Sequence, residues 1–272
     1  MIMSEPRTQI AAFETVRWEL DNKGIAWITM TRPKEMNALS AQSFIEMLDV
    51  LEQVGHDDAV RVVVLRGDGR AFCAGGDLQE MSDGFDGTYG FCKHMELANR
   101  FTATLAELPK PVIVAVNGAA TGAGMNVALA ADIAIAADNV KFSEIFGNVG
   151  LVPDVGGTYL LPRVVGRAKA KEIVMTYRMI SAQEAAELGI VNRVVPPEEL
   201  DAAVQELAER IAQGPTFALA LGKKLINRSF EVDLHTALDM ECMAQSLAGN
   251  SRDHKEGVAA FFEKRKPQFQ GR

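Results

Sequence analysis

PVIVAVNGAATGAGMNVALAAD, residues 111–132, joins a strand to a helix through a run of small residues. Residues 111–118 form a near-continuous apolar run, which is typical of a parallel strand buried on both faces. A helix is predicted over residues 122–132. The glycine and alanine residues between the two elements allow another backbone, or a ligand, to approach closely. This stretch therefore predicts one strand–loop–helix unit of an α/β protein.

The same order of elements extends outward in both directions. Residues 61–69 form another apolar run that ends in glycine, a helix is predicted over roughly 91–107, and a strand over 132–137. Strands that alternate with helices imply right-handed crossovers and a mostly parallel sheet. Residues 84–90 (GFDGTYG) have the composition of a mobile loop near a site.

The N-terminal part combines a hairpin with an amphipathic helix. Residues 12–20 and 24–32 alternate between apolar and polar side chains, and Asn22–Gly24 would form the turn between them. Ser40 is placed to cap a helix over residues 40–55. The apolar face of that helix would carry Phe44, Met47, Leu48 and Leu51.

Strand patterns nearly vanish beyond about residue 165. One short strand is predicted over 190–195, and the rest of this part reads as helices. We therefore divide the chain into a strand-and-helix core over 1–200 and a helical region over 201–272. The predicted helices lie within 167–176, 181–189, 196–213, 216–230, 234–249 and 251–265.

The composition is that of an ordinary globular protein, with 48% hydrophobic and 24% charged residues in a chain of 272. The net charge of −8 argues against nucleic acid or an anionic membrane as the main partner. Three cysteines without CxxC spacing exclude a disulfide framework and suit a reducing compartment. The four histidines form no HxxxH or HxH pair, so no metal site is expected. No leader and no apolar run of membrane length is present, and we expect a cytoplasmic protein.

Two junctions between strand and loop have a composition suited to binding an anion. One is RGDGRAFCAGGDL (66–78), and the other is VNGAATGAGMNVALAAD (116–132). The start of a helix offers free N–H groups with a partial positive charge. Two such junctions on neighbouring strands could aim two amides at one oxygen, which would form an oxyanion hole. Alternatively, the glycines serve only tight turns and close packing. Neither segment matches a GxGxxG or P-loop motif, so nucleotide binding is not indicated.

Several motifs together resemble those of one known family. They are RPKEMNAL (32–39), GRAFCAGGDL (69–78), KPVIVAVNGAATGAG (110–124), the stretch 142–166 and GVAAFFEKRKPQF (257–269). In this order, from about residue 14 to the C-terminus, the chain resembles the enoyl-CoA hydratase/isomerase family, also called crotonases. The resemblance implies the crotonase (ClpP-like) α/β fold, with repeated ββα units and an acyl-CoA site in residues 1–200. It also implies that residues 201–272 build a homotrimer or a dimer of trimers. Acyl-CoA thioesters are the implied substrates, with coenzyme A entering as part of the substrate and no separate cofactor.

The resemblance also implies which residues form the site. Two backbone amides, at Ala74 and Ala123, would polarise the thioester carbonyl. Phe261 and Lys264 of a neighbouring subunit would reach the coenzyme A; the alternatives are a core aromatic ring and a solvated lysine. The other residues expected along the acyl-CoA path are Ala38, Leu39, Gly75, Gly76, Asp77, Leu78, Gly122 and Phe146.

The chain departs from the pattern of the family's hydratases. Those enzymes resemble one another in carrying two glutamates, and the matching positions here are Asn126 and Phe146. Neither can exchange a proton as a glutamate does, whereas adding water to an activated double bond suits paired carboxylates. Glu144 lies two positions from the expected place, which would change the direction of its side chain. The departure favours an isomerase over a hydratase.

Asp154 stands among apolar and glycine residues in GLVPDVGGTYLLPRVVG (150–166). It could cap the helix that TYLLPRV predicts. The stretch also resembles the isomerase branch of the family, most closely the isomerases of ring-epoxidised phenylacetyl-CoA, in which an aspartate at this place is catalytic. We therefore interpret Asp154 as the one acid/base group for shifting a double bond, or opening a ring epoxide, through an enolate. Phe146, Leu151 and Val152 are expected to form an apolar wall that raises its pKa.

Three other functions remain open at this point. A hydratase could use Glu144 or a bound water. A hydrolase resembling the family's aryl-CoA dehalogenases could use Asp154 as a nucleophile, but its histidine base would fall at Asn99, about five residues from His94. The third alternative is a protein that binds acyl-CoA without converting it.

Overall fold

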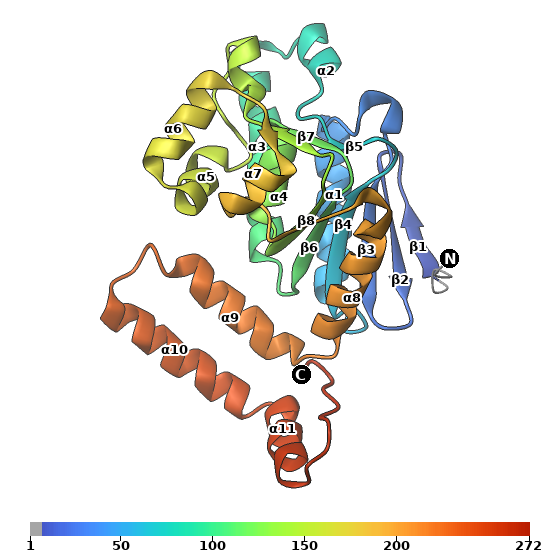
Figure 1. The fold of residues 1–272 in the computed structure, drawn as a ribbon, viewed down its shortest axis with the longest axis vertical. Helices are drawn as coiled ribbons and strands as arrows, with labels where there is room; N and C mark the ends of the chain where they lie inside the picture. The colour runs from blue at the N-terminus through green and yellow to red at the C-terminus, as the bar shows by residue number, and fades with distance from the viewer. Residues whose placement is uncertain (1–6) are drawn as a thin grey trace.

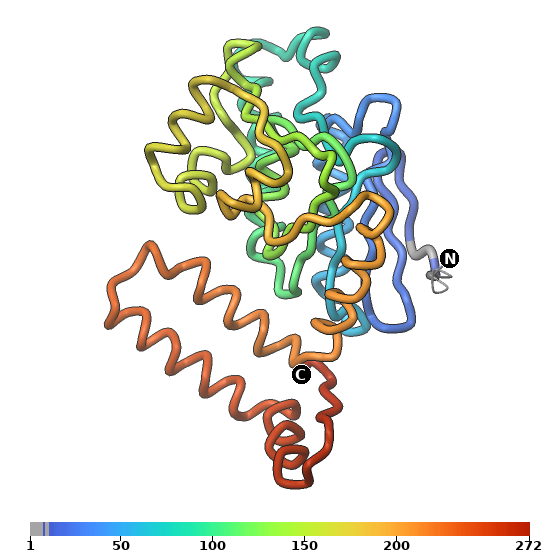
Figure 2. The backbone as a smooth tube through the Cα atoms, in the orientation of Figure 1, coloured from blue at the N-terminus to red at the C-terminus, as the bar shows by residue number. Residues whose placement is uncertain are grey.

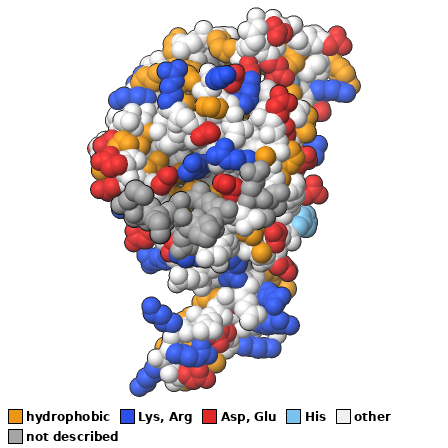
Figure 3. Space-filling model, turned by 90° about the vertical axis from the view of Figure 1, so that its right-hand side faces the viewer, with side chains coloured by type: hydrophobic (Ala, Val, Ile, Leu, Met, Phe, Trp, Pro, Cys, Tyr) orange, Lys and Arg blue, Asp and Glu red, His pale blue; other side chains and the backbone are white. Residues whose placement is uncertain are grey.

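The computed structural model describes residues 7–272 (Figure 1). Two sheets with their helices form a core, and the last three helices form an arm that lies beyond the core at one end of the longest axis of the molecule. On the face that carries the N-terminal strands, positively and negatively charged side chains are interspersed (Figure 3). Within the described part of the chain, we find no helix whose length and apolar character would let it span a lipid bilayer.

A seven-stranded sheet forms the larger layer of the core. Its strands are β1 (Arg7–Ala12), β2 (Val16–Asp21), β3 (Ile25–Met30), β4 (Val62–Gly67), β6 (Val112–Val116), β8 (Ile133–Ala137) and β11 (Arg193–Val195). They lie in the order β1-β2-β3-β4-β6-β8-β11, antiparallel up to β3 and parallel from there. The predicted hairpin is β2 and β3, and Gly24 turns it with a φ of 80°. The predicted buried strands are confirmed, with ends shifted by a few residues.

A smaller sheet was not predicted from the apolar patterns. It contains β5 (Ala71–Cys73), β7 (Ala119–Thr121), β9 (Lys141–Ser143) and β10 (Ile180–Ser181), in the order β10-β9-β7-β5. Strands this short show too little alternation to be recognised. Each of β5, β7 and β9 follows a strand of the larger sheet and precedes a helix along the chain. The repeated ββα units that the family resemblance implied are therefore present.

The helices of the core were predicted from the sequence, except α2. They are α1 (Ala41–His56), α2 (Leu78–Asp83), α3 (Gly87–Glu107), α4 (Ala123–Ala130), α5 (Gly157–Val165), α6 (Arg167–Thr176), α7 (Ala182–Glu187) and α8 (Leu200–Ala212). The Ser40 hydroxyl accepts a hydrogen bond from the Ser43 amide and caps α1, as predicted. Phe44, Met47 and Leu51 are buried, and Leu48 is partly buried. Short 3₁₀ helices are η1 (Pro33–Glu35), η2 (Ile145–Val149) and η3 (Pro197–Glu199).

Two sequence-based boundaries differ from the structure. Residues 84–90 were expected to form a loop, but α3 already begins at Gly87, so only residues 84–86 connect α2 and α3. The division at residue 200 assigned α8 to the helical region. Instead, α8 packs against β3, β4, β6 and β8, because its apolar face covers the larger sheet. The helices that leave the core begin only after α8.

The arm consists of α9 (Thr216–Arg228), α10 (Leu234–Gly249) and α11 (Arg252–Phe262), all predicted as helices. Lys223 of α9 forms an ion pair with Asp132 of the core, with 2.8 Å between Nζ and Oδ2. The last residues return from α11 to the base of the core (Figure 2). They are held by Asp253, whose carboxylate accepts hydrogen bonds from the amides of Gln270 and Gly271.

Candidate active site

Three loops meet at one edge of the smaller sheet. Since β5, β7 and β9 run parallel, their carboxyl ends lie at the same edge, and the loops after them begin at Ala74, Gly122 and Glu144. The Thr121 hydroxyl donates to the Ala74 carbonyl at 2.9 Å. The Gly122 amide donates to the Ser143 carbonyl at 2.8 Å. These bonds hold the three loops side by side.

The first loop offers a different amide from the one that we predicted. The Ala74 N–H already donates to the Met36 carbonyl, with 3.0 Å between N and O. Ala74 therefore has no free donor, and its placement in the oxyanion hole is wrong. The Gly75 carbonyl accepts a hydrogen bond from the Leu39 amide, and the Asp77 amide donates to the Leu39 carbonyl. In this parallel bridge, the N–H of Gly76 itself has no acceptor among the described residues. The amide of Gly76 is therefore a free donor of this loop.

The second loop offers the amide of Ala123. Ala123 is the first residue of α4, where an N–H has no partner within the helix, and the described residues provide no other acceptor. A side chain at Gly124 would place Cβ 2.1 Å from the Cys73 carbonyl oxygen, so α4 packs directly against the end of β5. A Cβ at Gly75 would lie 3.7 Å from the Ala123 nitrogen, which shows how close the two loops are. The role of Ala123 as an oxyanion donor stays a prediction.

The residues predicted along the acyl-CoA path differ in exposure. Leu39 is buried, Ala38 is partly buried, and Leu78 is exposed. The Asp77 carboxylate caps the first turn of α2 and pairs with Arg32, with 2.7 Å between Oδ2 and Nη2. Arg32 also donates to the Ala38 carbonyl at 2.7 Å. The Asp77 side chain therefore fixes the loop, and this loop could meet a ligand through its backbone.

Asp154 does not cap a helix. The N-cap of α5 is Gly156, and no side chain accepts a hydrogen bond from the first turn of α5. The Asp154 backbone carbonyl accepts from the Gly157 amide at 2.8 Å, but its Oδ1 atom is buried without a hydrogen-bond partner. Burial raises the pKa of Asp154 to about 6, although its own backbone amide opposes the shift. The capping alternative is wrong, and the carboxyl is available for proton transfer near neutral pH.

The apolar wall around Asp154 is only partly as predicted. Phe146 is buried, and its ring lies next to Gly122, where an added Cβ would be 3.6 Å from the ring. Leu151 is partly buried. Val152 is 77% exposed, so its placement in the wall is wrong. η2 ends at Val149 and is followed by Gly150 in the left-handed conformation; Val149 is exposed, as Val152 is.

Glu144, which the sequence suggested only as the base of a hydratase, lies close to Asp154. Its side chain is fully buried at the end of β9, and Oε2 accepts a hydrogen bond of 3.4 Å from the Asn126 amide group. The same Asn126 nitrogen donates to the Asp154 carbonyl at 2.9 Å. A Cβ at Gly157 would lie 2.3 Å from this nitrogen, so Asn126 needs a glycine there. Burial raises the pKa of Glu144 to about 8, and the nearby Asp154 carboxylate adds to this effect.

His94 is not placed as a partner of Asp154. It is buried on α3 between Phe44 and Phe85, with ring centroids 5.7 and 4.9 Å away, and burial lowers its pKa. These aromatic neighbours give no support to a hydrolase in which a histidine activates water. The cysteines are free, and burial raises the pKa of Cys73 to about 12. Within residues 7–272, His, Cys, Asp and Glu form no group of three or more that could hold a metal ion.

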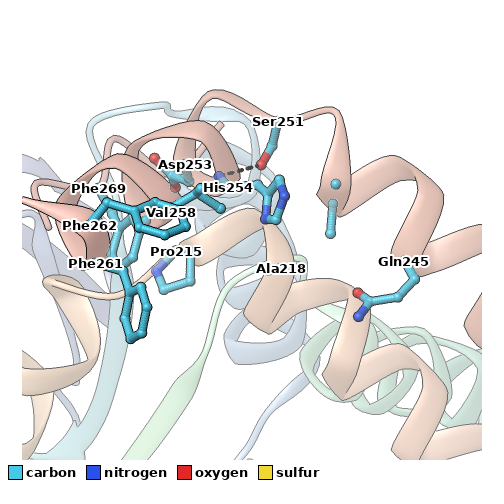
Figure 4. Close-up of a pocket in the computed structure, with 13 residues that line it drawn as sticks. Pro215, Ala218, Gln245, Ser251, Asp253, His254, Val258, Phe261, Phe262 and Phe269 are labelled. Carbon is cyan, nitrogen blue, oxygen red and sulfur yellow. Dashed lines mark hydrogen bonds between the residues drawn. The ribbon is translucent and has the colours of Figure 1, made fainter.

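Phe261 and Lys264 lie far from Asp154 within one chain. Phe261 lies in the last turn of α11, and Lys264 follows this helix. α11 lies at the opposite end of the long axis from β7 and α5 (Figure 1). Phe261 is 79% exposed, so the alternative of a core aromatic is wrong. Its ring borders an apolar pocket of about 790 Å³ between the helices of the arm (Figure 4). The pocket is lined by Pro215, Ala218, Gln245, Ala248, Gly249, Ser251, Asp253, His254, Gly257, Val258, Phe261, Phe262 and Phe269.

Comparisons with known proteins agree along nearly the whole chain. The profile of the enoyl-CoA hydratase/isomerase family matches residues 21–272. The 1,2-epoxyphenylacetyl-CoA isomerase of Escherichia coli (strain K12) is 44% identical over 255 residues, which cover 92% of this chain and 96% of that protein. The short-chain-enoyl-CoA hydratase of Clostridium acetobutylicum is 39% identical and covers 91% of this chain and 95% of its own length. The crystal structure of an enoyl-CoA hydratase/isomerase from Cupriavidus metallidurans CH34 superposes with a TM-score of 0.90 at 35% identity, over 96% and 98% of the two chains.

Proposed function

The chain belongs to the enoyl-CoA hydratase/isomerase family and has the crotonase fold, and from this premise we propose that it is an acyl-CoA isomerase. The observation that carries the proposal is Asp154, a partly buried carboxyl whose buried Oδ1 atom is unpaired and whose pKa is raised to about 6. The free amides of Gly76 and Ala123 on neighbouring loops support it. The most similar of the relatives described above is named an isomerase.

The proposed reaction needs one base and one oxyanion hole. The amides of Gly76 and Ala123 hold the thioester oxygen, where negative charge develops. Asp154 removes a proton from one carbon of the acyl chain, and the electrons of that C–H bond form the enolate. The protonated Asp154 then returns the proton to another carbon, which leaves the double bond in a new position. For a ring-epoxidised substrate, Asp154 would likewise remove the proton from the carbon next to the thioester, and the two amides would hold the enolate oxygen that receives the charge. No cofactor beyond the coenzyme A of the substrate is required.

A hydratase is the second candidate, and a specific observation favours it. Glu144 gives the site a second buried carboxyl close to Asp154, and several relatives are named hydratases. Against it, Asn126 and Phe146 occupy the positions where the family's hydratases are expected to carry glutamates. Burial without a cation also leaves Glu144 a poor base for water at neutral pH, because its carboxyl stays protonated.

The arm fits assembly into a homotrimer or a dimer of trimers. Leu234, Leu238 and Leu247 of α10 are exposed in the single chain, although burying them would be favourable. Assembly would also let Phe261 and Lys264 reach the coenzyme A bound by a neighbouring subunit. Free cysteines support a cytoplasmic location.

A turnover screen tests the isomerase proposal. We expect the protein to convert 3-enoyl-CoA to 2-enoyl-CoA, or to rearrange ring-epoxidised phenylacetyl-CoA, faster than it hydrates crotonyl-CoA. Asp154→Asn should lower isomerisation by about 10²–10⁴-fold, because it removes the base. Its melting temperature should change little, since Asp154 caps no helix. Glu187→Gln, at an exposed position on α7, is the matched control. Efficient hydration without isomerisation, or full activity in Asp154→Asn, would contradict the proposal.

A further inference from the structure

Three buried oxygen atoms around Asn126 lack a hydrogen-bond donor. They are Oε1 of Glu144, Oδ1 of Asn126 and Oδ1 of Asp154. The Asn126 amide group can donate two hydrogen bonds, and both are in use, toward Glu144 Oε2 and the Asp154 carbonyl. If both carboxyls were ionised, every unsatisfied atom would be an acceptor. Burying such atoms without donors is costly, so protonation of one of the two carboxyls is favoured.

The surroundings of the cluster do not supply positive charge. α4 contributes the neutral Asn126, the segment after η2 contributes Asp154, and the turn after α6 contributes Tyr177, whose carbonyl accepts from the Ser143 hydroxyl. Of the charged groups in residues 7–272, Asp154 is the one that acts on Glu144. A carboxylate buried without a cation becomes protonated. Glu144 is the more deeply buried of the two carboxyls and therefore holds the proton.

From this geometry, and resting on the proposed isomerase function, we infer that Glu144 is a positioning residue that must stay uncharged in the active enzyme. Its protonated carboxyl keeps Asn126 directed at Asp154 and limits the cluster to one negative charge. When Asp154 takes a proton from the substrate, the charge moves to the enolate, so the total charge of the site stays constant. If Glu144 were ionised, the enolate would form beside a second buried anion. Like charges repel strongly in such surroundings.

The pH dependence of kcat/KM tests this inference, because kcat/KM reports the ionisable groups of the free enzyme. Asp154 must be ionised and Glu144 protonated, with pKa values of about 6 and about 8. For the parent protein we expect a bell-shaped profile, with kcat/KM about ten-fold lower at pH 9 than at its maximum. Glu144→Gln cannot ionise at this position, so its profile should keep the acidic limb and lose the alkaline limb. Glu187→Gln should keep both limbs.

The possible outcomes separate the inference from the proposed function. A parent profile that stays flat up to about pH 10 would overturn the inference without any variant. An alkaline limb that persists in Glu144→Gln would also overturn it, as would a folded Glu144→Gln protein that is inactive at every pH. The inference would be supported if Glu144→Gln loses the alkaline limb while the parent protein and Glu187→Gln keep it. Full isomerisation by Asp154→Asn would contradict the proposed function instead, whatever the profile of Glu144→Gln.

Discussion

At the scale of single residues, a matched pair of variants tests the first oxyanion donor. Gly76→Pro removes the free N–H, whereas Gly76→Ala keeps it. The backbone of Gly76 is not in the left-handed region, and an added Cβ would meet only the flexible end of Met81, at 2.7 Å. Losing one oxyanion donor costs about 2.7–4 kcal/mol, so we expect Gly76→Pro to lower kcat by about 10²–10³-fold. Gly76→Ala should be affected far less. Equal activity of the two folded variants, measured as isomerisation rates, would place the thioester oxygen elsewhere.

The individual site residues show what a sequence can and cannot reveal. Asp154 stood out because a carboxylate among apolar residues, far from any basic side chain, is unusual. The free amide of the first loop was misplaced at Ala74, because the hydrogen bond to Met36 joins segments 38 positions apart. Glu144 was undervalued because its burial depends on β9, a strand too short to predict. Residue types were readable from the sequence, whereas contacts between distant segments were not.

At the scale of the elements, long strands and helices followed from their apolar periods. Strands such as β4 and β6 are buried along nearly their whole length, and α1 buries one face behind a capping serine. The smaller sheet escaped prediction because its strands have three residues or fewer. It was nevertheless this sheet that brought the three site loops to one edge. The family resemblance supplied it through the order of motifs, not through any local pattern.

The attachment of α9 to the core can be tested through one ion pair. Lys223 is largely buried, and its partner Asp132 also accepts a hydrogen bond from the Val112 amide. Lys223→Met would leave the partly exposed Asp132 carboxylate without its cation, which we expect to cost on the order of 1 kcal/mol. The double variant Lys223→Met/Asp132→Asn should recover much of this loss, since no unpaired charge remains. Denaturant unfolding at one fixed protein concentration measures both. If the double variant is no more stable than the single one, the ion pair is not what holds α9.

At the scale of the whole molecule, the arm is the feature that a single chain leaves unexplained. Its apolar side chains are exposed, its pocket lies apart from the site loops, and α11 lies far from Asp154 (Figure 1). A chain that folded for use as a monomer would not present this much apolar surface. Assembly of identical subunits would cover it and place the end of one arm against another subunit. The mass of one chain is 29.5 kDa, so a trimer or hexamer is readily distinguished by light scattering.

Mixed oligomers test whether one subunit completes the site of another. Asp154→Asn lacks the base, and Lys264→Ala should lose affinity for coenzyme A, seen as a higher KM. If Lys264 acts on a neighbouring subunit, co-expression of the two variants should create sites with an intact Asp154 from one chain and an intact Lys264 from the next. Such sites should regain the parent KM together with measurable turnover. If Lys264 acted within its own chain, every site of the mixture would lack either Asp154 or Lys264. No site would then combine turnover with the parent KM. Co-expressing Asp154→Asn with itself controls for expression, and an unchanged high KM in the mixture would refute contact in trans.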